Sequence, residues 1–175
     1  MKLTWFGGTT MRVHIGGKML VIDGAGAPEG VEPAELLSGA DSVVALDDGG
    51  LGQVAANWMP RRVGALLDAG DDTEVQMHRI GAGAIVVDAI GEQPLLLVTG
   101  AVEPIGRWTG NAVVVVMGAP ETLPELAATV LERLRPKLIA VAGPEAAAEQ
   151  VIALIGTSLD GTGLVSLEPG LALEV

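Results

Sequence analysis

Hydrophobic and polar positions follow regular patterns along the chain, and the clearest of them lies in the C-terminal half. Residues 112–117 read Ala-Val-Val-Val-Val-Met, a continuous apolar run that predicts a buried strand. Apolar residues between positions 122 and 134 fall on one side of a helix, and Thr122 and Glu125 have the spacing of a capping box at its start. The pattern then predicts a strand over residues 137–142, a helix over 144–155 and strands over 163–167 and 171–175.

Short apolar segments separated by glycine turns fill the N-terminal half. Residues 2–6 and 11–15 predict a strand pair around Gly7-Gly8, and Gly16-Gly17 predicts a tight hairpin before the next strand. Hairpins followed by alternating strands and helices indicate sheets that are covered by outer helices. Further along, the pattern predicts strands over residues 18–23, 41–46, 63–67, 74–78, 82–89 and 95–99, and helices over 32–37 and 53–59.

The composition fits one domain over residues 1–175 with a sizeable core. Hydrophobic residues make up 49% of the chain, yet no apolar stretch is long enough to span a bilayer. Lys2 is followed by Thr4 and the glycine turn rather than by the apolar segment of a signal peptide. The chain has no cysteine, which excludes disulfides and thiolate ligands to metals. We therefore predict a cytoplasmic protein that does not bind membranes.

The charge balance argues against nucleic acid as a partner. The formal net charge is −12 with 10 lysines and arginines, and aromatic residues make up 2% of the chain. Nucleic-acid binding depends on basic residues that neutralise phosphates and on aromatic side chains that stack with bases, and both are scarce here. The high apolar content instead predicts a homodimer, because small domains often bury excess apolar surface in a symmetric interface.

Two motifs near the N-terminus carry a resemblance to a known family. Gly7-Gly8-Thr9-Thr10 is similar to the Gly-His-Ala-Thr turn of lactonase-like hydrolases in the metallo-β-lactamase superfamily. Residues 16–23, Gly-Gly-Lys-Met-Leu-Val-Ile-Asp, match the Gly-Gly-Lys-x-Leu-x-Ile-Asp hallmark that follows it. The resemblance covers most of residues 2–143 and implies an α/β fold, the metallo-β-lactamase-like αββα sandwich of two mixed sheets with outer helices. The chain is shorter than typical members, chiefly between residues 60 and 95.

The positions that hold metal ions in that family carry other residues here. The family run His-x-His-x-Asp-His corresponds to residues 45–50, Ala-Leu-Asp-Asp-Gly-Gly, in which no histidine remains. Gly8 stands where the histidine of the first turn falls, Ala101 replaces a bridging aspartate, and Ala142 replaces a late histidine. Asp23 is kept, and its family counterpart supports the site rather than binding metal. We call this set the family-site positions: Gly8, Asp23, Ala45, Asp47, Asp48, Gly49, Gly50, Ala101 and Ala142.

The substitutions change what the site can do. Glycine and alanine side chains offer no donor atoms, whereas a zinc site needs three or four nitrogen, sulfur or oxygen ligands. The resemblance therefore implies a protein without metal or cofactor, with a binding or assembly role rather than a catalytic one. The alternative is a metal-dependent hydrolase with a rebuilt site, in which Asp23, Asp47 and Asp48 converge on a hard cation such as Mg²⁺. The partner stays open, a protein or a small molecule.

Other candidate residues carry weaker signals. His14 and His78 are far apart in the sequence and match no family ligand, which is typical of surface or interface histidines. Residues 50–55, Gly-Leu-Gly-Gln-Val-Ala, fit the outline of a dinucleotide site, with Asp68 beyond them. The two aspartates before these glycines would repel the phosphates of such a ligand, and the N-terminal hairpins do not belong to that fold.

Overall fold

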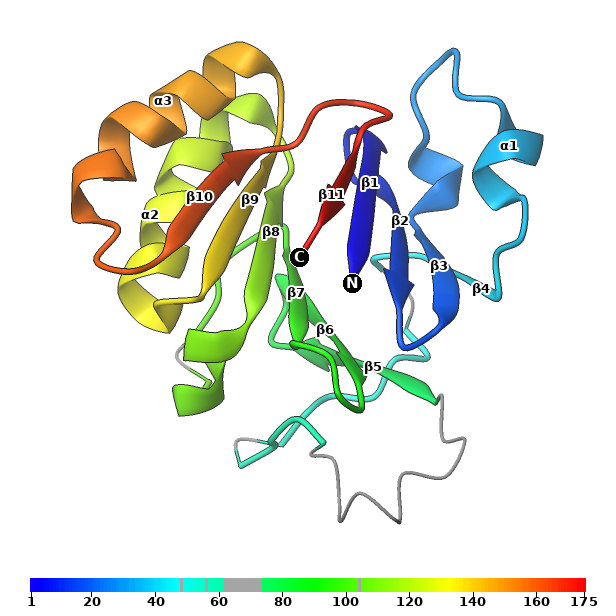
Figure 1. The fold of residues 1–175 in the computed structure, drawn as a ribbon, viewed down its shortest axis with the longest axis horizontal. Helices are drawn as coiled ribbons and strands as arrows, with labels where there is room; N and C mark the ends of the chain where they lie inside the picture. Colours follow the sequence, from blue (N-terminus) through cyan, green and yellow to red (C-terminus); the bar gives the residue numbers. More distant parts are fainter. Residues whose placement is uncertain (48, 56, 62–73, 104) are drawn as a thin grey trace.

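The computed structural model describes residues 1–47, 49–55, 57–61, 74–103 and 105–175, which fold into two facing mixed sheets (Figure 1). The first sheet has the strand order β11-β1-β2-β3-β4. Its members are β1 (Lys2–Gly7), β2 (Thr10–Ile15), β3 (Lys18–Ile22), β4 (Ser42–Val44) and β11 (Ala172–Glu174). Antiparallel pairs join β11, β1, β2 and β3, and β4 lies parallel to β3.

The second sheet has the order β10-β9-β8-β7-β6-β5. Its members are β5 (Val75–Ile80), β6 (Ala84–Ala89), β7 (Leu95–Val98), β8 (Val113–Met117), β9 (Leu138–Ala142) and β10 (Gly163–Ser166). The pairs from β7 to β10 are parallel, and β5, β6 and β7 form an antiparallel meander. Parallel neighbours need crossover connections, and α2 (Leu123–Leu134) and α3 (Glu145–Ile155) supply two of them.

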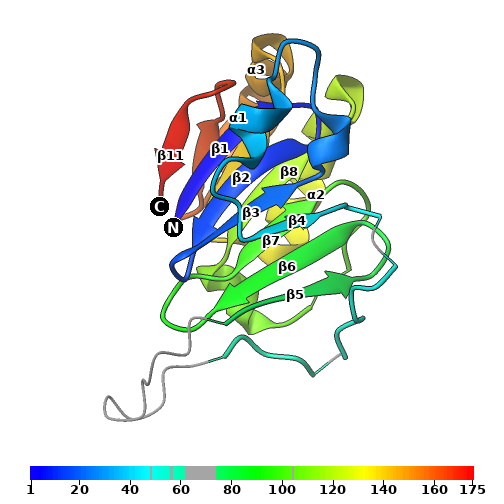
Figure 2. The same ribbon diagram turned by 90° about the vertical axis from the view of Figure 1, so that its right-hand side faces the viewer.

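Helices lie on the outer sides of both sheets, which confirms the predicted αββα fold class. α2 and α3 cover the second sheet, and the short α1 (Pro33–Leu37) lies outside the first (Figure 1). Figure 2 views the first sheet from its outer side and shows α1 near one end of the strands. Much of that face is polar, and Lys2 and His14 are exposed on it. Each described helix is too short or too polar to cross a bilayer.

Two apolar cores follow from the alternation of side chains along the second sheet. In β8, Val113, Val115 and Met117 belong to the core between the sheets, whereas Val114 and Val116 belong to the core under the helices. A sheet that is covered on both faces needs apolar residues at every strand position. This double burial is the physical reason for the continuous apolar run that predicted β8.

One predicted helix is wrong. Within the described part of residues 53–59 the chain forms no helix, and Gln53 instead makes a bridge beside Arg79 of β5. The backbone N–H of Val54 donates to the carbonyl of Arg79, and the N–H of Arg79 donates to the carbonyl of Gly52, both at 2.9 Å. Pairing with the edge of the second sheet therefore replaces helix formation. The dinucleotide outline fails with it, because its glycines do not open a helix.

The predicted capping box is also not formed. Thr122 ends a short 3-10 turn (Pro120–Thr122), and its hydroxyl donates to the carbonyl of Ala119 at 2.8 Å rather than to the first turn of α2. Pro124 occupies the first turn of the helix, as predicted, where a missing N–H costs little. The strand predicted over residues 63–67 lies outside the described residues.

Candidate functional site

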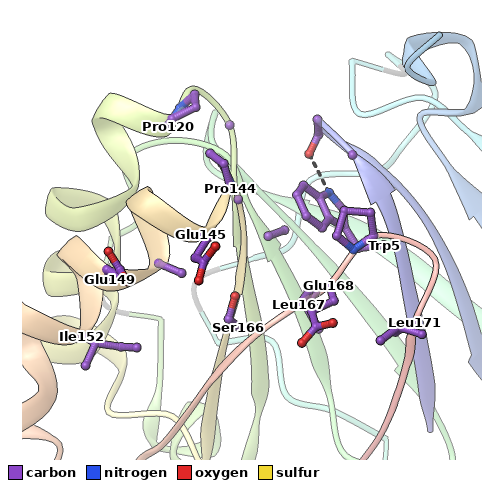
Figure 3. A pocket seen from close by; sticks show the side chains of 17 residues that line it. Trp5, Pro120, Pro144, Glu145, Glu149, Ile152, Ser166, Leu167, Glu168 and Leu171 are labelled. Atoms are coloured by element: carbon purple, nitrogen blue, oxygen red, sulfur yellow. Dashed lines mark hydrogen bonds between the residues drawn. The ribbon is translucent and has the colours of Figure 1, made fainter. Parts of the chain in front are cut away.

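A groove of about 990 Å³ opens where several strands of the two sheets end. Its lining comes from the β1–β2 turn, the ends of β8, β9 and β10, the first two turns of α3 and the β10–β11 connection (Figure 3). Two of the family-site positions, Gly8 and Ala142, line it. The groove therefore adjoins two of the positions at which the resemblance places metal ligands.

Trp5 forms one side of the groove floor. It is 5% exposed and belongs to the core between the sheets. Its indole Nε1–H donates to the carbonyl of Gly8 at 3.0 Å, which ties the ring to the β1–β2 turn (Figure 3). That turn needs glycine, because Gly7 and Gly8 have φ values of 122° and 53° and a Cβ on Gly7 would lie 2.6 Å from Pro28.

Ala142 and Leu167 complete the floor. Ala142 is 1% exposed at the end of β9, and Leu167, just after β10, is 3% exposed. The backbone N–H of Leu167 donates to the carbonyl of Val141 at 2.9 Å, which holds the two segments together. Both residues share the inter-sheet core with Trp5. An apolar floor therefore occupies the side of the groove from which a histidine ligand at position 142 would project.

Carboxylates stand above this floor. Glu145 and Glu149 lie one turn apart on α3, and Glu168 lies on the opposite wall (Figure 3). We call these three the acidic rim. All three are exposed, they form no ion pair within the described residues, and no lysine, arginine or histidine lines the groove. Ile152 on α3 and Leu171 on the facing wall, which we call the apolar lips, are 53% and 59% exposed.

Asp23 supports the backbone at the other side of the family-site region. Its carboxylate accepts a hydrogen bond from the hydroxyl of Thr9, and its backbone carbonyl accepts one from the hydroxyl of Thr10 at 2.8 Å. Its backbone N–H donates to the carbonyl of Val44 at 2.7 Å. Asp23 therefore joins the β1–β2 turn to the ends of β3 and β4.

The loop after β4 is held by packing and by one arginine. Leu46 and Leu51 pack against the inter-sheet core, and Nη2 of Arg79 donates to the carbonyl of Leu46 at 2.6 Å. The remaining described family-site positions of this loop are exposed and do not line the groove: Ala45, Asp47, Gly49 and Gly50. Asp48 lies outside the described residues.

Ala101, after β7, is exposed and also does not line the groove. Gly100, just before it, lies so close to Gly83 that a Cβ added to Gly83 would be 2.6 Å from the carbonyl carbon of Gly100. Of the two histidines, His14 is exposed on the first sheet, and His78 packs edge-on against Trp58 with ring centroids 6.0 Å apart. Neither histidine lines the groove.

The described family-site positions do not fit a zinc ion. Gly8, Ala45, Gly49, Gly50, Ala101 and Ala142 have no side-chain donors, so that Asp23 and Asp47 are the only described family-site positions with donor atoms. Within the described ranges, no group of three or more histidine, cysteine, aspartate and glutamate side chains could hold a metal ion. A tetrahedral zinc site therefore has no ligand set in this part of the chain.

Sequence reasoning missed the residues that give the groove its character. Glu145 and Glu149 have the i, i+4 spacing of one helical face, a signal that could have been noticed. Trp5 and Glu168 carry no such signal, because only folding places them around one groove.

Comparison with solved structures decides the fold. The isothiocyanate hydrolase from Delia radicum gut bacteria aligns over 100% of this chain and 99% of its own, with a TM-score of 0.60 and 12% identity. The chain has the metallo-β-lactamase fold. Igni18, a metallo hydrolase of the archaeon Ignicoccus hospitalis, aligns over 99% of this chain and 98% of its own, with a TM-score of 0.52 and 15% identity.

A Thermotoga maritima protein assigned to the metallo-β-lactamase superfamily as a zinc-dependent hydrolase gives a TM-score of 0.49 at 16% identity, over 96% of this chain and 99% of its own. No protein-family model and no curated protein matches the sequence. These likenesses show the fold of this chain, and the hydrolase activities belong to the neighbouring proteins.

Proposed function

We propose that this chain is a non-catalytic protein of the metallo-β-lactamase fold that acts by binding a partner in the groove beside the family-site positions. The observation that carries the proposal is the floor of the groove. Gly8 and Ala142 supply no donor atoms there, and Trp5 and Leu167 pack as apolar surface. A large surface cavity with an apolar floor and a few polar side chains is typical of a binding site.

Physical chemistry links the missing donors to missing catalysis. In metal-dependent hydrolysis the ion lowers the pKa of a bound water to about 7 and polarises the scissile bond. Without imidazole or carboxylate ligands at positions 8, 101 and 142, the chain lacks the means to hold such an ion in the way the resemblance describes. Binding needs none of those ligands.

The second candidate is a hydrolase with a rebuilt carboxylate site. It is favoured by the hydrolase activities of proteins that share the fold and by the exposed Asp47 in the loop after β4. In this candidate Asp47 and Asp48 would bind a hard cation together with Asp23. Against this candidate, the described residues include no group of three or more histidine, cysteine, aspartate and glutamate side chains that could hold a metal ion.

Elemental analysis of the purified, dialysed protein separates the two candidates. The proposal expects far less than one equivalent of zinc, manganese or iron per chain, and unchanged melting with added Mg²⁺ or Mn²⁺. The hydrolase candidate expects metal-dependent stabilisation that is lost in an Asp47→Ala, Asp48→Ala variant and kept in a Glu29→Ala, Glu32→Ala control. A stoichiometric metal that survives dialysis would overturn the proposal.

The homodimer expected from composition belongs to the same proposal. An assembly role requires an interface, and exposed apolar side chains such as Val43 and Met59, both 55% exposed, are available for one. Light scattering coupled to size exclusion would give the mass in solution. A mass of one chain at all concentrations would contradict this part.

A further inference from the structure

Resting on the proposed binding role, we infer that the groove receives a short basic peptide segment. Its apolar side chains lie on the floor and between the apolar lips, and its lysine or arginine side chains pair with the acidic rim. The floor of the groove is apolar, and the charged side chains that line the groove are all negative.

The apolar lips add solvent-exposed apolar surface to the groove, beyond the buried side chains of its floor. Ile152 and Leu171 are 53% and 59% exposed, on opposite walls, and both line the cavity. A partner that reaches both walls would remove these side chains from water, which is the main favourable term in association. The floor residues Trp5 and Leu167 are already buried and offer a preformed surface.

The charge of the groove selects a cationic partner. Its titratable lining side chains are the three glutamates of the acidic rim, which have no ion-pair partner within the described residues. Three carboxylates around one groove repel each other, and a basic side chain relieves that repulsion as it binds. The chain as a whole has a formal net charge of −12, which also speeds the approach of cations.

The spacing of the rim favours a peptide over a single amine. Glu145 and Glu149 are separated along the α3 axis by about 6 Å, the rise of four helical residues. Alternate side chains of an extended peptide repeat every ~6.6 Å on one face. An extended Lys-x-Lys segment therefore matches the two carboxylates, and the one side chain between the lysines would face Leu171 on the other wall. One ammonium group would reach only part of this length.

Fluorescence anisotropy with a fluorescein-labelled peptide of alternating lysine and leucine tests the inference on the full chain. We expect saturable binding that weakens with salt. A Glu145→Gln, Glu149→Gln, Glu168→Gln variant should bind about tenfold more weakly, the scale of three exposed ion pairs. The matched control is Glu29→Gln, Glu32→Gln, Glu132→Gln, which changes the net charge equally at exposed positions outside the groove. It should bind within about twofold of the unmodified chain.

The apolar part of the inference has its own variant. Ile152→Ser with Leu171→Ser alters exposed side chains, so that melting should change little while peptide affinity falls. A peptide of alternating glutamate and leucine should not bind. Equal weakening in both glutamine variants would reduce the effect to general charge attraction, and full competition by hexylamine would indicate an amine site instead. Either result would overturn the inference.

Peptide binding and metal content test the basic-peptide partner and the proposed function separately. A metal-free chain that ignores the peptide would remove the basic-peptide partner and leave the binding role standing. A chain that holds a stoichiometric metal would remove the non-catalytic proposal, whatever the peptide does.

Discussion

Apart from Ala101, the described family-site positions lie in two regions with different surroundings. The groove region contains Gly8 and Ala142, next to an apolar floor that is open to solvent from one side. The loop region contains Asp23 and the described residues of the loop after β4, and it is held by hydrogen bonds and by packed leucines. The comparison shows that the two regions around the family-site positions are stabilised by different interactions. In one region apolar side chains pack against each other, and in the other polar side chains hydrogen-bond to each other and to backbone carbonyls.

The difference has a consequence for function. Apolar floor atoms have no fixed hydrogen-bond direction, so that a groove built on them can accept a partner without breaking existing bonds. In the loop region, by contrast, the hydrogen bond from Thr9 already fixes the direction of the Asp23 carboxylate, so that a new partner would have to match that direction. The groove region is therefore the better place to expect binding.

The largest expected effect on stability comes from removing the Trp5 side chain from the floor of the groove. Trp5→Ala deletes a side chain that is 5% exposed, and we expect the free energy of unfolding to fall by about 3–5 kcal/mol. Chemical denaturation measures the change. Trp5→Phe is the control, because it keeps an aromatic ring in the core while it loses the hydrogen bond to Gly8 and the remaining indole atoms, with an expected cost of about 1–3 kcal/mol. Equal stability of the two variants would mean that the floor is not packed as described.

Restoring histidines at the two groove positions tests whether the region still has room for them. Ala142→His should destabilise by about 2–4 kcal/mol, because the site is 1% exposed and the imidazole would be overpacked and poorly solvated. Gly8→His should cost about 1–2 kcal/mol, from its left-handed φ of 53° alone, since a Cβ there meets nothing within 4 Å. Thermal melts of both variants would show the order. A more stable Ala142→His variant would contradict an apolar floor at position 142.

Removing the Asp23 carboxylate tests the loop region. Asp23→Ala deprives the Thr9 hydroxyl of its acceptor and places alanine at a left-handed φ of 50°, with an expected loss of about 1–3 kcal/mol. Asp23→Asn keeps an acceptor oxygen and a residue that tolerates this backbone conformation, and it should lose less than about 1 kcal/mol. Denaturation of both variants, with Thr9→Val beside them, measures the difference. Identical losses for alanine and asparagine would exclude the bond to Thr9 as the cause.

The smallest expected effect on stability concerns the carboxylate of Asp41. This residue lies just before β4, whereas the loop region follows β4. The backbone N–H of Met19 donates to its Oδ2 at 2.8 Å and lowers the pKa of Asp41 below 3.8, with a smaller contribution from Lys18. Because the folded pKa is depressed, the stabilisation is present above pH 3.8 and is lost as the pH falls through the folded pKa. NMR titration should give a midpoint below 3.8 for Asp41, rising toward 3.8 in Lys18→Met. A midpoint at or above 3.8 would contradict the bond.

The elements that the sequence predicted best are those whose pattern has one physical cause. The apolar stripe between residues 122 and 134 arises because α2 buries one face, and the run in β8 arises because both of its faces are covered. The helix predicted over residues 53–59 failed because pairing with β5 competes with local preference. Local patterns do not contain that competitor, since Arg79 lies far along the chain.

The candidate site shows the same division. The donor-free residues at positions 8, 101 and 142 are visible in the sequence once the motifs are aligned. The groove was not predicted. Its floor includes Trp5, and its walls come from α3 and the connection around Glu168. This connection reaches β1 through the N–H of Gly170, which donates to the carbonyl of Trp5 at 2.7 Å.

The sequence by itself determined the main buried strands and helices, because periodicity reports which faces are buried. Its N-terminal motifs implied the αββα fold by resemblance, and residue type showed that most family-site positions have no side-chain donor atoms. Tertiary structure alone decided that two of those positions adjoin a groove with an apolar floor and an acidic rim. That arrangement depends on contacts between segments more than a hundred residues apart, such as Trp5 with Gly170, and no local preference specifies such contacts.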